Sequence, residues 1–414
     1  MWARGYVRVY KEIYPFISMC KFFGLAPYTI LINEETGEGT IDSSFIKNLG
    51  GLVCTATLSI CMMFGLFDIV SSIKLARKAS VTDTLSKMFC MPMFFFLALA
   101  SLLMNGTVIK QKIKQLLQIF SDIDKGIINL HKESITRGSL FSIRNILSHL
   151  DILVLTFVII PYLIYDSVIW GIGVFFIHSY IMRISQLLIV ITVMQYCKFV
   201  IYVWQILSEF CDILSHYAQL ELPRIEKHID ALPHISKIHP EWRPRIDRDI
   251  TEIVVALRRM YSQLCEAVHL INIMYGLLVL LEIATNFTVG ITSVSTIMSI
   301  IKANRRPRHP TDLKPLLSNA ICILISSSLL ITMIIFCQMT TWKSKKLANI
   351  INNISLKYPL KLDTLQQLKL FTSQICYNSF EFTAFWLFRL DSNLLCTIFA
   401  SAVTYTAVLA QLNP

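Results

Sequence analysis

The chain has 414 residues, of which 54% are hydrophobic and only 16% are charged. Soluble domains carry about 25% charged residues, and long soluble chains usually divide into several separate cores. This composition therefore argues against a soluble protein and predicts a polytopic membrane protein. The net charge of +11 is carried by cations in loops between apolar runs, which favours a role in membrane topology over nucleic-acid binding.

The apolar runs predict seven transmembrane helices, since a span needs about 20 apolar residues. Phe22–Ile32 is too short to span and predicts an interfacial or partly buried segment. The run Ile152–Met194 would reach about 64 Å as one helix, about twice the thickness of the hydrocarbon layer, so it must fold back near Asp166. The predicted spans are Leu49–Ser72, Met88–Ile109, Leu147–Tyr165, Val168–Lys198, Leu270–Ile300, Leu316–Thr340 and Asn393–Leu412.

The distribution of Lys and Arg predicts the orientation of these spans. If the N-terminus lies inside the cell, the inner segments hold 27 of the 38 Lys and Arg residues. We therefore expect a cytosolic N-terminus and, after seven spans, an extracellular C-terminus. The resulting regions are a cytosolic N-terminal segment (1–48), spans one to six with helical cytosolic extensions (49–340), a cytosolic anchor segment (341–392) and the last helix with the C-terminus (393–414).

Three inner segments have the apolar periodicity of amphipathic helices. They are Lys110–His131, Ile246–Tyr275 and Leu362–Phe388. Spans two, four, five and six are therefore expected to continue as helices beyond the membrane. Four such extensions can bury their apolar faces together, which favours a packed helical cytosolic layer over separate linkers on the membrane surface.

The chain contains no motif that predicts an enzyme. It has no GxxxxGK[ST], GxGxxG, HExxH or GxSxG sequence, and its eleven cysteines show no CxxC spacing. His228, His234 and His239 lie around prolines, where a solvated turn is a better interpretation than a metal site. We therefore expect no catalytic residue, no cofactor and no metal.

One arc of the last predicted helix is polar. Successive residues of a helix are rotated by about 100°, and six side chains of this helix fall within an arc of roughly 100°. Polar groups in a span must face protein or water rather than lipid. The arc predicts either a small-residue packing face or the wall of a pore, and the amide of Gln411 favours the pore. Val408 and Leu412 would then form apolar rings that gate by dewetting. The arc comprises Thr397, Ser401, Thr404, Val408, Gln411 and Leu412.

At these residues the chain resembles the insect chemoreceptor superfamily, and within it the gustatory receptors. The family signature is Thr-Tyr, five apolar residues and Gln-Phe, and Thr404, Tyr405 and Gln411 match it, while Leu412 replaces the Phe. A Gln-Leu ending also resembles the odorant co-receptor branch. Two further stretches are similar to family patterns. Their matching positions are Phe382, Ala384, Phe388, Leu390, Asp391, Leu394 and Leu395, and before the fifth span Leu264, Cys265, Ile271, Asn272, Tyr275 and Gly276.

The resemblance implies a ligand-gated, non-selective cation channel in the plasma membrane. It implies a homotetramer, or a heterotetramer with other gustatory receptors, in which four last helices surround the pore and the cytosolic helices form an anchor. Matching positions imply that Val408 and Leu412 are gate residues and that Gln411 lies at the pore. The implied partners are a small-molecule tastant, cations passing through the pore and membrane lipid.

Aromatic and polar residues in the outer halves of the spans are candidates for a ligand pocket. Tyr165 and Trp170 also suit an interfacial aromatic belt. Glu282 is more informative, since an ionisable group within a span is expected to pair with a neighbour or to contact a ligand such as an amine. The candidates are Tyr162, Tyr165, Trp170, His178, Glu282, Asn286 and Thr292.

Three other classes of protein share some features with a gustatory receptor channel. An odorant receptor subunit of the same superfamily is the closest. A heptahelical receptor coupled to G proteins would have an outside N-terminus and motifs that this chain lacks. A secondary transporter predicts two halves with interrupted helices, and we find no such repeat.

Overall fold

The computed structural model describes seven segments of the chain, the last of them with two residues left out. These are residues 4–26, 28–32, 39–42, 91–131, 175–218, 242–304 and 313–412, without 359 and 379, together with scattered positions between 53 and 67. Most of the first predicted span and all of the third lie outside the described residues.

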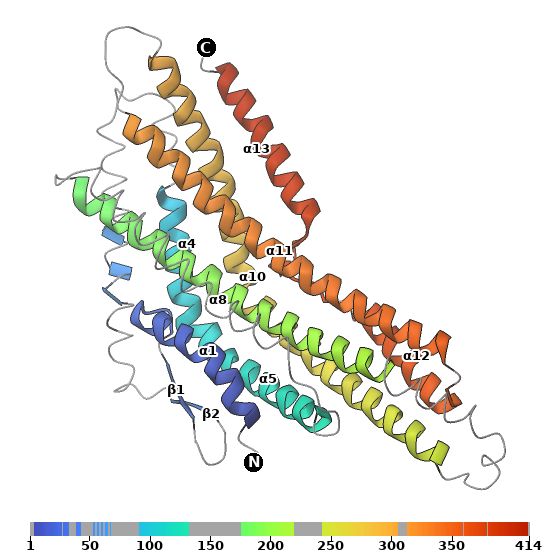
Figure 1. The fold of residues 1–414 in the computed structure, drawn as a ribbon. Helices are drawn as coiled ribbons and strands as arrows, with labels where there is room; N and C mark the ends of the chain where they lie inside the picture. Colours follow the sequence, from blue (N-terminus) through green and yellow to red (C-terminus); the bar gives the residue numbers. More distant parts are fainter. Residues whose placement is uncertain are drawn as a thin grey trace.

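Long helices dominate the described part of the chain (Figure 1). α8 (Phe175–His216), α10 (Trp242–Asn304) and α11 (Leu313–Lys357) have 42, 63 and 45 residues. At about 1.5 Å per residue they reach about 63, 95 and 68 Å, at least twice the hydrocarbon thickness of about 30 Å. The predicted fourth, fifth and sixth spans therefore do continue as helices well beyond the length of one crossing.

A fourth long helical segment combines three elements. α4 (Met91–Met104) continues through one π-helical turn, η2 (Asn105–Ile109), into α5 (Lys110–His131). In the described residues, four helices are long and apolar enough to cross a membrane, namely this segment, α8, α10 and α11. α13 (Ser392–Leu412) is a shorter apolar helix.

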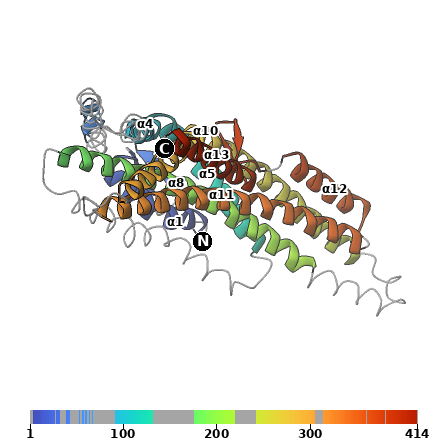
Figure 2. The same cartoon turned by 90° about the horizontal axis from the view of Figure 1, so that it is seen from above.

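The lower halves of the long helices pack into a layer (Figures 1 and 2). α5 has the bounds predicted from periodicity, and its apolar face is buried against α10 and the N-terminal helix. The buried residues recur at three- and four-residue spacing, as Ile113, Leu116, Phe120, Ile123 and Ile127. A hydrogen bond of 2.7 Å from the Tyr202 hydroxyl to the Asp124 carboxylate joins α8 to α5 within this layer.

The N-terminal segment contains structure that the hydropathy pattern did not predict. α1 (Arg4–Phe22) packs along α5, and β1 (Thr29–Ile32) pairs antiparallel with β2 (Gly39–Asp42). Between α1 and β1, Leu25, Ala26 and Tyr28 are fully buried. This burial agrees with the predicted partly buried segment, although the strands were missed.

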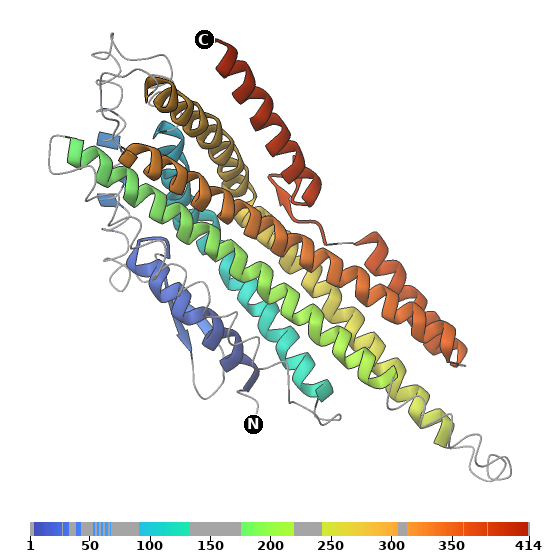
Figure 3. The ribbon, with the colours of Figure 1, turned by 45° about the horizontal axis from the view of Figure 1, so that its top comes forward.

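The predicted helical stretch Leu362–Phe388 is wrong in its second half. α12 (Leu362–Tyr377) ends eleven residues earlier, and two short strands follow, β3 (Thr383–Ala384) and β4 (Phe388–Arg389). These strands form a hairpin between α12 and α13 (Figure 3). The apolar residues that suggested a continued helix are instead divided between β3, whose two residues are buried, and the turn with β4, whose residues are exposed.

Candidate functional site

The hairpin that precedes α13 has an unusual turn. β3 and β4 pair antiparallel, with Thr383 opposite Arg389. Phe385 and Trp386 in the turn have φ of 49° and 62°, a left-handed conformation that is strained for bulky residues. Contacts with the rest of the molecule must therefore hold the hairpin in this shape.

Asn272 and Gly276 of α10 provide two of these contacts. Asn272 Nδ2 donates a hydrogen bond of 2.7 Å to the Glu381 carbonyl, and Asn272 Oδ1 accepts one of 3.2 Å from the Thr383 N–H. The side-chain amide thus pairs with the β3 backbone as a neighbouring strand would. At Gly276, a Cβ atom would lie 3.0 Å from the backbone nitrogen of Phe385. The two motifs noted before the fifth and seventh spans therefore meet in space at this hairpin.

Further hydrogen bonds hold the segment between α12 and β3. The Tyr261 hydroxyl of α10 donates to the Asn378 carbonyl at 3.2 Å and lies 3.0 Å from the Ser344 hydroxyl of α11. The Thr341 hydroxyl of α11 donates to the Phe380 carbonyl at 3.1 Å. Polar side chains of two long helices thus fix the chain just before it enters the hairpin.

α13 is attached to the rest of the chain along one side. Asp391 Oδ1 accepts a hydrogen bond of 3.0 Å from the Leu394 N–H, which caps the start of the helix. Leu394, Leu395 and Ile398 pack against the core, and the helix lies against α10 and α11. Further along, the Tyr405 ring lies 5.8 Å from the Phe287 ring of α10.

Another side of α13 is uncovered in the single chain. The Thr397 and Thr404 hydroxyls donate to carbonyls one turn back in the same helix, each at 2.9 Å. Of the polar arc predicted from the sequence, Thr397, Thr404, Val408 and Gln411 are exposed and Ser401 is half-buried. The Leu412 side chain lies outside the described residues.

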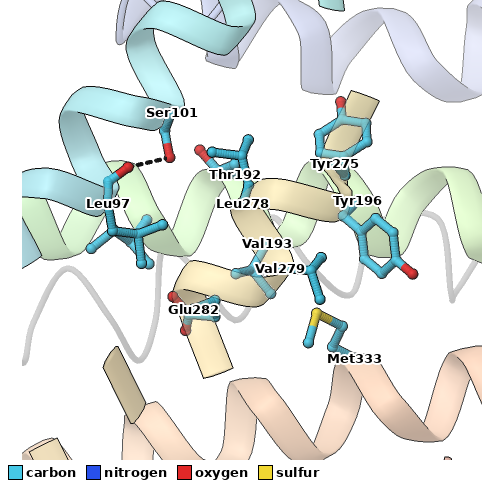
Figure 4. Close-up of a pocket in the computed structure, with 11 residues that line it drawn as sticks. Leu97, Ser101, Thr192, Val193, Tyr196, Tyr275, Leu278, Val279, Glu282 and Met333 are labelled. Carbon is cyan, nitrogen blue, oxygen red and sulfur yellow. Dashed lines mark hydrogen bonds between the residues drawn. The ribbon is translucent and has the colours of Figure 1, made fainter. Parts of the chain in front are cut away.

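A small cavity lies between α4, α8, α10 and α11 (Figure 4). It has space for roughly one water molecule. Its apolar lining comprises Leu97, Ile189, Val193, Leu278, Val279 and Met333. Its polar lining comprises Ser101, Thr192, Tyr196, Tyr275 and Glu282.

Among the residues of this lining that the structure describes, Glu282 is the one carboxylate, and it is 4% exposed. Its Oε1 accepts a hydrogen bond of 2.7 Å from Asn286 Nδ2, while Oε2 has no hydrogen-bond partner among the described residues. The Ser101 and Thr192 hydroxyls are already bonded to carbonyls of their own helices, at 2.8 and 2.9 Å. Among the described residues of the lining, the side-chain atoms without a hydrogen-bond partner are therefore Glu282 Oε2 and the Tyr275 hydroxyl, and only Glu282 is a carboxylate.

The cavity wall also contacts the hairpin. The Tyr196 ring lies 5.7 Å from the Tyr275 ring and 6.5 Å from the Phe382 ring, which belongs to the segment leading into β3. Tyr196 also shares a hydrogen bond of 3.2 Å with the Cys337 thiol of α11. Aromatic side chains thus connect the cavity with the base of α13.

Residues 13–413 match the model of the family described as 7tm chemosensory receptor. The chain belongs to this family. The family consists of chemosensory receptors and is not an enzyme class. Family membership, together with the long apolar helices, identifies this receptor as a multi-pass membrane protein.

Solved structures of an insect olfactory receptor share the fold of this receptor. The structure of OR5 from Machilis hrabei in complex with eugenol aligns with a TM-score of 0.62 at 10% identity, over 98% of this chain and 99% of that one. The structure of OR5 described without eugenol aligns with a TM-score of 0.67 at 8% identity and the same coverage. No curated protein sequence matches the receptor.

The structure places only part of the predicted ligand pocket. Tyr162, Tyr165 and Trp170 lie outside the described residues, as does the side chain of His178 in α8. Of the remaining candidates, Glu282 lines the cavity, and Asn286 donates a hydrogen bond to the Glu282 carboxylate. Thr292 instead donates to the Thr288 carbonyl of its own helix at 2.8 Å.

Several lining residues of the receptor were not predicted. Tyr275 stands in the motif quoted before the fifth span, which could have marked it as a site residue. Ser101, Thr192 and Tyr196 carry no such signal, because only the packing of α4 and α8 against α10 brings them together. In the described residues, no group of three His, Cys, Asp or Glu side chains could hold a metal ion.

Proposed function

We propose that this receptor is a ligand-gated, non-selective cation channel of the gustatory type, which opens when a small-molecule tastant binds. Four copies would surround a pore in the plasma membrane, as a homotetramer or with other gustatory receptors. Each copy would contribute α13 to the pore wall, with the lower helical layer as a cytosolic anchor.

The observation that carries this proposal is the uncovered polar side of α13. Thr397, Thr404 and Gln411 are exposed on a helix whose other side packs on α10 and α11. Polar side chains of a membrane helix have to face protein or water. Copies of α13 around an axis would provide the water-filled space, and Val408 and Leu412 would form apolar rings that close it by dewetting.

The contacts between the cavity and the hairpin suggest how a ligand opens the pore. A ligand that binds the open arrangement better than the closed one shifts the population toward open. A change at Tyr196 or Tyr275 would reach Phe382 and the hairpin through ring contacts, and the hairpin directs the start of α13. This route would convert a small rearrangement at the cavity into a movement of the pore helix.

An odorant receptor subunit remains the second candidate, because the Gln411-Leu412 ending resembles the co-receptor branch and the fold is that of an olfactory receptor structure. A panel of sugars, bitter compounds and volatile odorants applied to cells expressing this chain alone, with calcium imaging, separates the two. Responses to soluble tastants support the gustatory type, and responses confined to volatiles support the alternative.

Cysteine accessibility tests the pore wall directly. Thr404→Cys and Val408→Cys, made in a Cys396→Ser background because Cys396 is exposed on α13, should be modified from water by a charged thiol reagent that then blocks current. Val403→Cys provides the matched control, since Val403 is 69% exposed on the same helix but lies about 140° around the helix from Val408. Equal block at positions 403 and 408 would contradict the proposed wall.

A further inference from the structure

The buried carboxylate of Glu282 suggests which chemical class of ligand the cavity takes. An ionised carboxylate without compensation is costly in a low-dielectric interior. Here a single amide, from Asn286, donates to it at 2.7 Å, and no cation among the described residues forms an ion pair with it. The second oxygen, Oε2, is therefore available to a ligand.

The rest of the lining favours a cation over an anion or a neutral ligand. The eleven described residues of the lining include no Lys, Arg or His, so an anion would meet the carboxylate and no positive group among them. Tyr196 and Tyr275 contribute aromatic rings, whose negative faces attract cations. A neutral alcohol could also bond to Glu282, but only a cation would favour the ionised form of the carboxylate.

The size of the cavity indicates which part of the ligand it holds. Space for roughly one water molecule fits an ammonium group but not a complete organic molecule. Met333 lies on the wall, and its unbranched thioether side chain can change rotamer to make room. The neighbouring apolar residues, such as Leu97 and Val279, suit the hydrocarbon part of a ligand (Figure 4).

We infer that this cavity binds the protonated amine head of a small apolar ligand, with Glu282 as the counter-ion and with Tyr196 and Tyr275 on the same lining. This inference rests on the proposed function, since it names the ligand class for that channel. The ligand is recognised by one charge-assisted hydrogen bond inside an otherwise apolar lining. Such bonds are about twice as strong as neutral ones, so the charge should dominate selectivity.

Matched pairs of probes separate charge from shape. 2-Phenylethylamine and 2-phenylethanol share a skeleton, as do butylamine and 1-butanol, and only the amines are protonated at neutral pH. Binding is measured as the increase in melting temperature of the purified full-length chain in detergent, which needs no channel activity. The amines should stabilise the chain at concentrations at least about tenfold lower than the alcohols.

Glu282→Gln tests the counter-ion, because it keeps the shape and removes the charge. It should weaken amine binding at least about tenfold and leave alcohol binding unchanged. Glu266→Gln is the matched control on the same helix, since Glu266 bonds to Gln115 at 3.0 Å, away from the cavity, and it should bind amines like the wild type. Comparable melting temperatures without ligand show that each variant folds.

The outcomes distinguish this inference from the channel proposal. Equal stabilisation by amines and alcohols, none by either, or unchanged amine binding by Glu282→Gln would overturn the amine site. If other ligands still evoked currents, the proposal that the chain is a channel would stand. Amine binding that depends on Glu282 in a chain that conducts no current would instead keep the site and reject the channel.

Discussion

Asn272 and Gly276 lie one helical turn apart on α10 and act on the same hairpin in different ways. Asn272 satisfies a carbonyl and an N–H of the hairpin backbone, groups that are costly to leave unpaired when buried. Gly276 contributes by lacking a side chain, because a Cβ atom would meet backbone rather than a movable side chain. The strained φ values of Phe385 and Trp386 show what these two contacts have to maintain.

Gly276→Ala should destabilise the receptor by about 1–3 kcal/mol, because the added methyl group has to displace the hairpin backbone. Gly290→Ala is the matched control on the same helix, where a Cβ atom meets nothing within 4 Å. That variant should be neutral or stabilising, since alanine favours helix by about 1 kcal/mol over glycine. Melting temperatures of the two purified variants give the comparison, and equal values would show that the close approach at position 276 has no energetic consequence.

Asn272→Ala should cost about 2–4 kcal/mol, because it leaves the Glu381 carbonyl and the Thr383 N–H without their partner. Asn353→Ala removes an exposed amide from α11 and should change stability by less than about 0.5 kcal/mol. Thermal unfolding in detergent measures both. A loss at position 272 no larger than at position 353 would mean that the hairpin does not depend on α10.

The α10 helix connects the cavity with the hairpin, which the sequence patterns did not link. Tyr275, Leu278 and Glu282 line the cavity, while Asn272 and Gly276, on the same stretch, hold the hairpin. A single rigid helix therefore contacts both the candidate ligand site and the base of α13. Because packed helices move as units rather than bending continuously, a shift of this stretch would move both the cavity lining and the hairpin.

At the level of α13, opposite charges at Val408 should have opposite effects. Val408→Lys should lower single-channel cation conductance at least about twofold, and Val408→Glu should maintain or raise it, because a ring of charge in a narrow pore repels or attracts cations. Patch-clamp recording at low ionic strength gives the clearest difference, since salt screens the field. A similar change from both substitutions would indicate a packing effect and count against a pore position.

At the scale of the whole molecule, periodic segments were predicted well and the elements that depend on remote contacts were not. Lys110–His131 was predicted with the bounds of α5 because its apolar spacing fits one helix face. The hairpin at 383–389 was missed because its turn contains Phe385 and Trp386, with no glycine or asparagine to signal it, and because Asn272, about 110 residues earlier, holds its backbone.

The candidate site shows the same division. Glu282 was singled out because a charge within an apolar run is unusual. Its neighbours Ser101 and Tyr196 were not, since four helices have to pack before these side chains share a cavity. Local pattern therefore identifies the residue with unusual chemistry, and tertiary packing determines its surroundings.

The distribution of charge predicts the orientation of the whole chain in the membrane, and this orientation can be measured directly. Most Lys and Arg residues lie in the segments expected inside, and in Figure 1 α1 begins at the lower side of the molecule, whereas α13 ends at the upper side. An epitope tag after Pro414 should therefore be labelled by antibody on intact cells, whereas a tag before Met1 should be labelled only after permeabilisation. Labelling of both tags on intact cells would require an even number of spans, and the reverse pattern would place the helical layer outside the cell.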